Sequence, residues 1–394
     1  MKRLAWWHKK QGLDGSLTGA APAEVLSRTG WARSVGGAAP YLTLLARAGN
    51  GREDIDKSVA DLHIHELPSA RGCTYVVPAD DFALALKVGQ PASEVPINQA
   101  RKYLDVTDRE LETLYRAVLD ALAPGRPLTP DQVKEACGGA VRNLGDAGKK
   151  RGLSTTLPLA LGYLQAQGEI RRVPVNGRLD QQRYAYTRWT ANPLKGFTLS
   201  YEEALTELAG RYFRWIGPAS MAHFQWFSGL GVAASKGAVA PLGLVPVAEG
   251  EPLLMLPDEV EPYHAFVPPA EPQIAMVSSL DGLMLLRREV APLIAEEDQQ
   301  RPVFAEKGAQ AAGGLTDAPF HTIVDRGQII GFWEYDPDRH QIVWMTFSTP
   351  PAELHHIIEQ TETYARDQLG DVRSFSLDSP ASRAPKLAWL RQHR

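Results

Sequence analysis

The spacing of apolar residues predicts a helical N-terminal unit that contains at least one strand. Segment 72–78 is rich in β-branched and aromatic residues and predicts a strand, and 79–88 predicts a capped amphipathic helix. Further helices are expected over 23–29, 40–49 and 54–65. We set the boundaries of this first unit, which is expected to resemble a winged helix, at residues 1–104.

The second unit, residues 105–196, carries the clearest pattern. Residues 108–122 place their leucines and Val118 on one helical face, Thr129 caps a short helix that has Pro130 at its first position, and 154–167 predicts a third helix. A hairpin follows, with strands over 169–175 and 183–188 and a turn at Asn176-Gly177. Three helices followed by a hairpin is the order of a winged helix-turn-helix, in which the hairpin is the wing and the third helix faces DNA.

The third unit, residues 197–256, repeats this order loosely and indicates a weak internal repeat. Its elements are expected over 202–215, 217–229, 230–239 and, as a hairpin, 242–256. The last unit, 257–394, begins with a Pro- and Glu-rich stretch, 257–272, that predicts a linker. Three antiparallel strands and a helix then follow, over 320–324, 328–335, 341–347 and 350–369. The fold class expected is therefore α+β, with tandem winged helix-turn-helix units and a C-terminal antiparallel β/α domain.

Charge is distributed unevenly along the chain. The net charge of the 394 residues is −4, but residues 139–195 carry ten Lys or Arg and three acids, whereas 251–300 carry ten acids and two Arg. A local basic face attracts a phosphate backbone because binding releases condensed counterions. The DNA-binding candidates of this stretch are Lys149, Lys150, Arg151, Arg171, Arg172, Arg178 and Arg183. The alternative is a solvated charged surface, which basic runs usually form.

Several other classes of protein are disfavoured. No run of eighteen apolar residues occurs, and charged residues interrupt the N-terminal segment, so neither a membrane span nor a signal peptide is expected. Two distant cysteines, Cys73 and Cys137, are typical of reduced thiols in a cytoplasmic protein. The pair His63 and His65 has no third ligand nearby in a segment expected to end a helix, so we expect no metal. Without a P-loop or other nucleotide motif, no cofactor is expected either.

Several stretches together resemble the AlkZ/YcaQ-type winged-helix DNA glycosylases. Each is weak, but they occur in order over nearly the whole chain. They are Gln11-Gly12-Leu13, Ala32-Arg33-Ser34, Pro40-Tyr41-Leu42-Thr43-Leu44, Ala70-Arg71-Gly72 with Val77-Pro78, Tyr212 with Gly217-Pro218-Ala219, Trp226 and Gly229-Leu230, Ser278-Ser279-Leu280-Asp281 with Arg287-Arg288, and Val324-Asp325-Arg326-Gly327 with Gly331.

The resemblance implies a C-shaped molecule whose positively charged channel holds double-stranded DNA. Active members of the family excise alkylated purines and unhook interstrand crosslinks by hydrolysing the N-glycosidic bond, without a metal. The function expected from it is therefore DNA binding in repair, by a monomer, on alkylated or crosslinked duplex. The alternative is a non-catalytic or regulatory DNA-binding protein.

The catalytic motif of the family is not matched. Active members carry Gln-x-Gln or Gln-x-Asp shortly before the helix that begins at Pro40, and the two possible alignments place it on Thr29-Gly30-Trp31 or on Arg33-Ser34-Val35. Neither offers a group that polarises water, and Arg33 would repel a developing cation. The candidates for a replacement are Asp281 and Glu66. For Asp281 the alternative is a structural carboxylate paired with Arg287 or Arg288.

The resemblance also draws attention to three residues of the first unit as DNA-binding candidates. Arg71 lies in the Arg-Gly piece and is a candidate for contact with phosphate or with the reacting centre. Tyr75 and Arg33 are the other two DNA-binding candidates. The alternative for Arg71 is an arginine that braces a turn.

Overall fold

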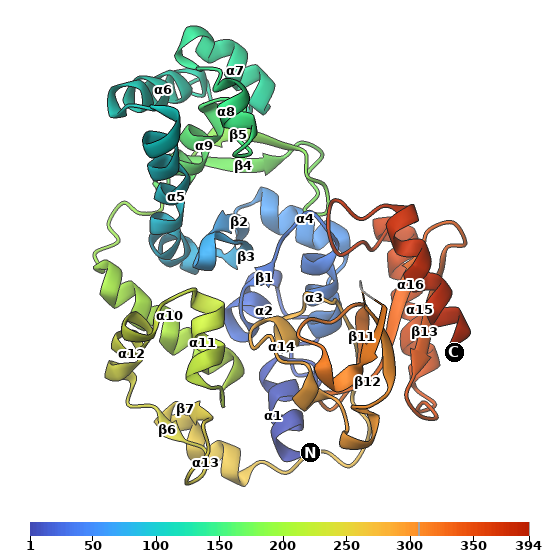
Figure 1. The fold of residues 1–394 in the computed structure, drawn as a ribbon. Helices are drawn as coiled ribbons and strands as arrows, with labels where there is room; N and C mark the ends of the chain where they lie inside the picture. The colour runs from blue at the N-terminus through green and yellow to red at the C-terminus, as the bar shows by residue number, and fades with distance from the viewer. Residues whose placement is uncertain (306–307, 394) are drawn as a thin grey trace.

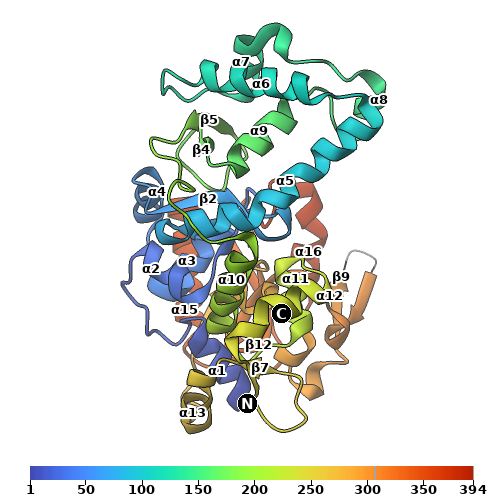
Figure 2. The same ribbon diagram turned by 90° about the vertical axis from the view of Figure 1, so that its left-hand side faces the viewer.

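The computed structural model describes residues 1–305 and 308–393. In Figure 1 the N-terminal residues lie at the centre of the molecule, residues 105–196 form a lobe that projects at the top, and the C-terminal residues lie on the right. Figure 2 shows the helices of the same lobe projecting above the rest of the chain. No helix in the described part of the chain has the length and apolar character needed to cross a membrane.

The N-terminal region folds around a small antiparallel sheet with strand order β1-β3-β2. Its elements are α1 (Lys2–Lys10), α2 (Pro22–Thr29), β1 (Ala32–Arg33), α3 (Ala39–Ala48), α4 (Arg52–Ala60), β2 (Ile64–Pro68) and β3 (Thr74–Pro78). The helix predicted over 54–65 is wrong at its end, because the chain leaves helical geometry at Leu62 and His65 pairs with Val77 in the sheet. Pairing with β3 and burial of His65 outweigh the local helical pattern.

A long helix, α5 (Phe82–Leu104), connects this region to the projecting lobe and extends well beyond the predicted 79–88. The lobe contains α6 (Asp108–Ala121), α7 (Pro130–Cys137), α8 (Gly145–Lys149), α9 (Leu157–Ala166) and the strands β4 (Ile170–Pro174) and β5 (Tyr184–Arg188). Thr129 caps α7 as predicted, and β4 and β5 form the predicted hairpin. The lobe has a core of its own, formed where α6, α7, α9 and β4 meet.

The next region contains α10 (Tyr201–Ile216), α11 (Met221–Ser228), α12 (Val232–Val239) and the short pair β6 (Val245–Pro246) and β7 (Leu254–Met255). It packs α10 and α11 against the N-terminal sheet, and α12 packs on these two helices. The linker predicted over 257–272 is wrong in its first half, where α13 spans Pro257–Ala265. Pro257 occupies the first turn of α13, where its missing N–H is not needed, and buried Glu259 pairs with Lys10.

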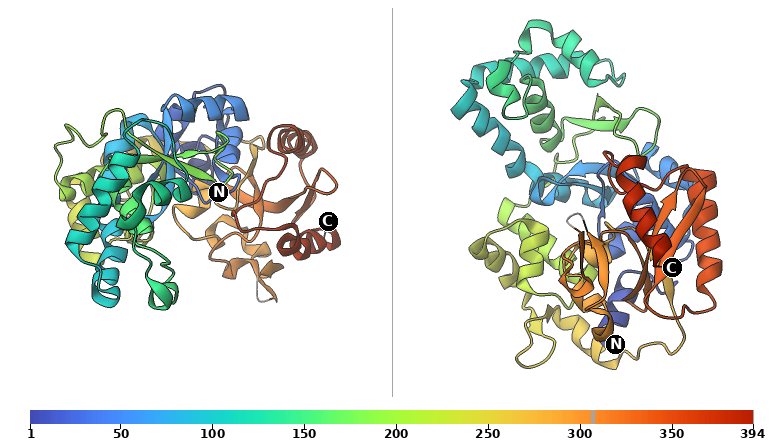
Figure 3. Two further views of the ribbon diagram at one scale, coloured as in Figure 1. Left: turned by 90° about the horizontal axis from the view of Figure 1, so that it is seen from above. Right: turned by 45° about the vertical axis from the view of Figure 1, so that its right-hand side comes forward.

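The C-terminal region is a four-stranded antiparallel sheet of order β13-β12-β11-β8 with a helix on each face (Figure 3). Its elements are β8 (Ile274–Val277), α14 (Gly282–Leu285), β9 (Pro302–Ala305), β10 (Gly308–Ala311), β11 (His321–Asp325), β12 (Gln328–Asp336), β13 (Gln341–Thr346), α15 (Leu354–Tyr364), a π-helical turn (Ala365–Leu369) and α16 (Pro380–Gln392). The three predicted strands and the helix after them are confirmed. Strand β8 and helix α16 were not predicted.

The hydrophobic cores join regions that are distant in sequence. Tyr41 and Ile64 of the N-terminal region share a core with Trp333 and Trp344 of the C-terminal sheet. A second core joins the N-terminal sheet to α10 and α11. The N-terminal region therefore lies between the C-terminal sheet and helices α10 and α11, and it contributes one wall of a cavity that all three regions line.

Candidate functional site

A cavity of about 670 Å³ opens where three of these regions meet. Its walls come from residues 31–33 and 71–75 of the N-terminal region, 226–227 of α11 and 279–288 around α14, together with parts of the C-terminal region between residues 304 and 386. Figure 1 shows these parts converging around α14. The cavity therefore depends on the tertiary fold, because no single stretch of sequence supplies it.

The sheet wall presents one cation and two aromatic rings. Strand β1 pairs with β3 so that Arg33 lies opposite Tyr75, and alternation places Trp31 on the same face as Arg33. The Arg33 guanidinium donates to the Thr74 carbonyl at 2.9 Å, and its carbon lies 5.5 Å from the Tyr75 ring. Burial raises the pKa of the Tyr75 phenol, which stays neutral. The Trp31 indole N–H donates to Asp81, outside the cavity lining, at 2.7 Å.

The rim is formed by two arginines stacked on one tryptophan. The guanidinium carbons of Arg71 and Arg288 lie 3.3 and 4.0 Å from the Trp226 ring centroid, well within cation–π distance. The Trp226 indole N–H donates to the Leu285 carbonyl at 3.1 Å, which fixes the ring. Both arginines have left-handed backbone conformations, and Arg288 also pairs with Asp317, with Nε 3.0 Å from Oδ1.

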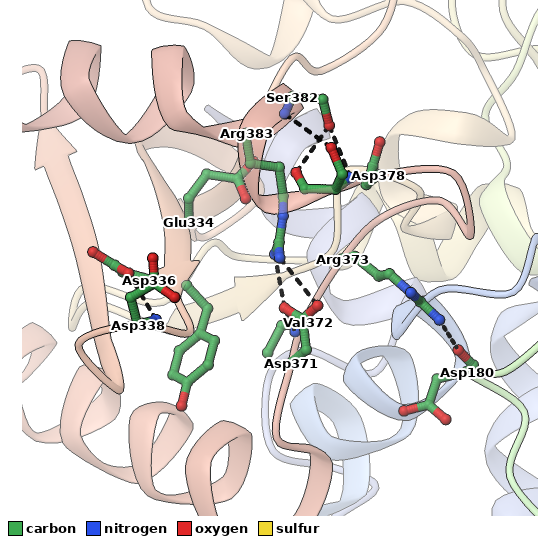
Figure 4. Close-up of polar contacts among 12 residues, drawn as sticks. Asp180, Glu334, Asp336, Asp338, Asp371, Val372, Arg373, Asp378, Ser382 and Arg383 are labelled. Atoms are coloured by element: carbon green, nitrogen blue, oxygen red, sulfur yellow. Dashed lines mark hydrogen bonds and ion pairs between the residues drawn. The ribbon is translucent and has the colours of Figure 1, made fainter.

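Lys386 of α16 contributes a fourth cation from the opposite wall. Its Nζ lies 3.8 Å from Oε1 of Glu334, which is buried in β12. Figure 4 shows that the guanidinium of Arg383 points past Glu334 to Asp371, which it contacts at 2.7 and 3.0 Å. With its nearest arginine paired elsewhere, burial raises the pKa of Glu334 to about 7. The Glu334 carboxyl, which lies beside Lys386, is therefore only partly ionised at neutral pH.

The charges of the described lining residues sum to +3. The cations are Arg33, Arg71, Arg288 and Lys386, and the acid is Asp317. Among these lining residues, Asp317 supplies the carboxylate and Gln310 supplies the amide. The described lining thus carries a net positive charge, which suits an anionic ligand.

Asp281, predicted as a catalytic candidate, is fully buried and does not line the cavity. It accepts from Arg47 at 2.7 and 2.9 Å and from the Leu283 N–H at 2.9 Å, which caps α14. The alternative interpretation named Arg287 or Arg288 as its partner and is corrected to Arg47. Arg287 is instead buried against Trp7, where desolvation lowers its pKa to about 9. These contacts are those of a structural carboxylate, and a catalytic role for Asp281 stays a prediction.

Glu66, the second catalytic candidate, lies on the face of the sheet that is turned away from the cavity. Its carboxylate accepts from the Ser34 hydroxyl and, at 3.3 Å, from the Tyr184 hydroxyl. Arg172 lies 3.9 Å from its second oxygen. Glu66 therefore binds the hairpin β4–β5 to the N-terminal sheet, and a catalytic role for it stays a prediction.

Of the four hairpin arginines predicted to bind DNA, three already have partners within the molecule. Arg171 stacks near Trp189, and desolvation lowers its pKa. Arg172 donates to the Thr74 hydroxyl at 3.3 Å. Arg178 pairs with Asp180 and donates to a backbone carbonyl of the π-helical turn at 2.8 Å. Arg183, the fourth of these candidates, is exposed and therefore accessible to a phosphate.

The remaining basic candidates lie in the projecting lobe and do not line the cavity. Lys149, Lys150 and Arg151 are exposed at the end of α8 (Figure 2). Lys149 lies 3.4 Å from Asp146, and Arg151 stacks on Tyr103 at 4.1 Å. Lys149, Lys150 and Arg151 therefore form a cationic surface separate from that of the cavity.

The histidine pair offers no metal site in this fold. His65 is buried in β2, where desolvation lowers its pKa to about 3, whereas His63 is exposed. Over residues 1–305 and 308–393, no three His, Cys, Asp or Glu side chains gather closely enough to hold a metal ion.

Sequence reasoning found part of the cavity and missed the rest. Arg33, Arg71 and Tyr75 were predicted as DNA-binding candidates from weak motifs, and all three line the cavity. Lys386 and Asp317 were missed because neither lies in a local pattern with a chemical signature. Only the tertiary contacts of α16 and of the segment before β11 bring them to the cavity.

Comparison with known proteins gives two matches. The family model described as DNA glycosylase AlkZ-like matches residues 32–370. Among solved structures, the Streptomyces sahachiroi DNA glycosylase AlkZ superposes with a TM-score of 0.69 at 19% sequence identity, over 94% of this chain and 97% of that chain. A search of curated proteins finds no match.

Proposed function

Because this chain belongs to the AlkZ-like DNA glycosylase family, we propose that it binds double-stranded DNA in a repair role and presents one strand to the cationic cavity. The observation that carries the proposal is the set of arginines on the cavity wall. Arg33 and Arg71 contact aromatic rings and a carbonyl, and neither has a carboxylate within ion-pair distance among the described residues. Such cations are available to phosphates.

We propose that the projecting lobe makes a second contact with the duplex. Its helices followed by the hairpin β4–β5 have the order of a winged helix, and Lys149, Lys150 and Arg151 project from it into solvent. Arg183 at the exposed side of the hairpin would join them. We propose that the region containing α10–α12 and the strand pair β6–β7 is a further winged-helix unit.

The proposed chemistry is hydrolysis of the N-glycosidic bond, for which a group must position water near the sugar. Arg33 of strand β1 and Trp31, which precedes the strand, cannot do this. Within the described lining, Asp317 and Gln310 carry the oxygen atoms suited to the task. The alternative function, binding without excision, is favoured by one observation: Arg288 occupies both oxygens of Asp317.

Binding is tested with the purified chain and a fluorescent duplex over a range of salt concentrations. Neutralising two phosphate contacts in Arg33→Gln/Arg71→Gln is expected to reduce the slope of log affinity against log salt by about 2 and to weaken binding about tenfold at low salt. Lys57→Gln, at an exposed position on α4, is the matched control. An unchanged slope in the double variant would contradict the proposal.

Excision is tested separately on duplexes that carry alkylated or crosslinked bases. Release of a base by the wild-type chain and its loss in Asp317→Asn would support the enzymatic function. Tight binding of these duplexes without release of a base from any of them would support the alternative function, binding without excision.

A further inference from the structure

Two large apolar side chains are exposed on the segment that borders the cavity just before α16. Phe375 is 45% exposed, and Leu377, at 91%, is the most exposed large hydrophobic side chain in the described part of the chain. Phe375 also lines the cavity. Figure 4 shows the segment as a loop between Arg373 and Asp378. Single exposed apolar residues are common on protein surfaces, but two within three residues beside a cavity indicate an interaction surface. These two side chains form an apolar tip.

The backbone that carries the apolar tip is held in place by hydrogen bonds. The Ser376 N–H, between the two apolar residues, donates to the Val35 carbonyl at 3.2 Å and so ties the segment to the N-terminal region. The Phe375 N–H donates to the Asp378 carboxylate at 2.9 Å, and the Asp378 N–H donates back to the Phe375 carbonyl at 3.1 Å. The apolar tip therefore projects from a turn whose shape is fixed before any partner binds.

Cationic side chains accompany the apolar tip. Arg33 and Lys386 line the cavity that Phe375 borders. The hairpin β4–β5 also reaches the segment, because the Gln182 amide donates at 3.3 Å to the Val35 carbonyl that accepts from the segment backbone. Arg183, the next residue of the hairpin, is exposed. Apolar side chains flanked by cations suit a surface in which apolar faces lie between phosphates, and a base step of double-stranded DNA is such a surface.

We propose that the apolar tip is a wedge that enters the duplex between two base pairs beside the nucleotide that faces the cavity, with Leu377 leading and Phe375 behind it. Insertion partly unstacks the step, and the burial of apolar surface together with the phosphate contacts of the neighbouring cations offsets that cost. This inference rests on the proposed function, since it requires a duplex at the cavity, and it names the residues that deform that duplex.

The test compares two duplexes of the same sequence, one intact and one with a single tetrahydrofuran abasic site, by fluorescence anisotropy. A missing base leaves room in the stack, so we expect the wild-type chain to bind the abasic duplex about tenfold more tightly. In Leu377→Ala this preference is expected to fall several-fold, and in Phe375→Ala/Leu377→Ala to disappear. The slope of log affinity against log salt should stay unchanged in both variants, because no phosphate contact is removed. Val267→Ala, at a valine that is 80% exposed, is the matched control and should keep the preference.

The outcomes separate the inference from the proposed function. Failure to bind either duplex, by a chain whose folding is verified by circular dichroism, would overturn the proposed function. Equal binding of the two duplexes by the wild type, or a preference that Leu377→Ala retains in full, would overturn the inference and leave DNA binding standing. A wild-type dimer in analytical ultracentrifugation that Leu377→Ala dissociates would also overturn it, because a second copy of the chain would then cover the apolar tip.

Discussion

At the residue scale, the buried ion pair between Arg47 and Asp281 allows a structural role of Asp281 to be distinguished from a catalytic role by experiment. Removing one partner of such a pair leaves an uncompensated charge, which costs about 3–5 kcal/mol of unfolding free energy. We therefore expect Asp281→Asn to lose stability on this scale, as measured by urea denaturation. Asp317→Asn, whose ion pair with Arg288 is exposed, is expected to lose less than about 1 kcal/mol. A stable Asp281→Asn variant without excision activity would instead restore the catalytic prediction.

Glu334 is expected to make stability depend on pH. Burial raises the pKa of its carboxyl from an ordinary value of 4.5 to about 7, so the folded chain binds more protons than the unfolded chain between these values. Its contribution to stability is therefore fully present below about pH 4.5 and is lost as the pH rises through 7. The loss is on the order of 3 kcal/mol.

This pH dependence is measured as the difference in unfolding free energy between pH 5 and pH 8. Glu334→Gln cannot ionise, so the difference should shrink in that variant. Glu53→Gln, whose side chain is 91% exposed, is the control and should behave like the wild type. If the difference were as large in Glu334→Gln as in the wild type, another group would be responsible.

At the element scale, the hairpin β4–β5 is expected to be held to the body of the molecule by Arg178. This residue bridges Asp180 and the carbonyl of Leu369. We expect Arg178→Ala to increase amide hydrogen exchange in the hairpin by roughly tenfold, because about 1.5 kcal/mol of charged hydrogen bonding is lost. Arg183→Ala, on the same hairpin but exposed, should leave exchange unchanged. Equal exchange in the two variants would show that other contacts hold the hairpin.

The elements that could be predicted from the sequence are those with local signals. Thr129 and Pro130 mark the start of α7, and Asn176-Gly177 marks the turn of the hairpin, because capping and turn chemistry act within a few residues. Strand β2 could not be predicted, because its conformation depends on pairing with β3. Helix α13 was hidden by its prolines, of which Pro257 lies in the first turn.

The same contrast applies to the candidate site. Arg33, Arg71 and Tyr75 could be named together because the resemblance draws attention to this part of the chain, and all three line the cavity. The residues that complete the cavity around them could not be predicted in this way. Trp226 becomes the platform for Arg71 only through packing of α11 against the N-terminal sheet, and Lys386 reaches the cavity only because α16 covers one face of the C-terminal sheet.

At the scale of the whole molecule, the question is whether the cavity and the projecting lobe engage one duplex together. The two cationic surfaces are joined by α5, so simultaneous binding would make the second contact intramolecular and raise the overall affinity. We therefore expect Lys149→Gln/Lys150→Gln to weaken binding of a duplex of about 30 base pairs by tenfold or more, and to leave a duplex of about 10 base pairs, too short to reach both surfaces, little affected. Fluorescence anisotropy at fixed salt measures both affinities, with Lys57→Gln as the control. An equal loss for the two lengths would mean that the lobe alone binds short DNA, because a duplex seated only in the cavity has no reason to sense charges on α8.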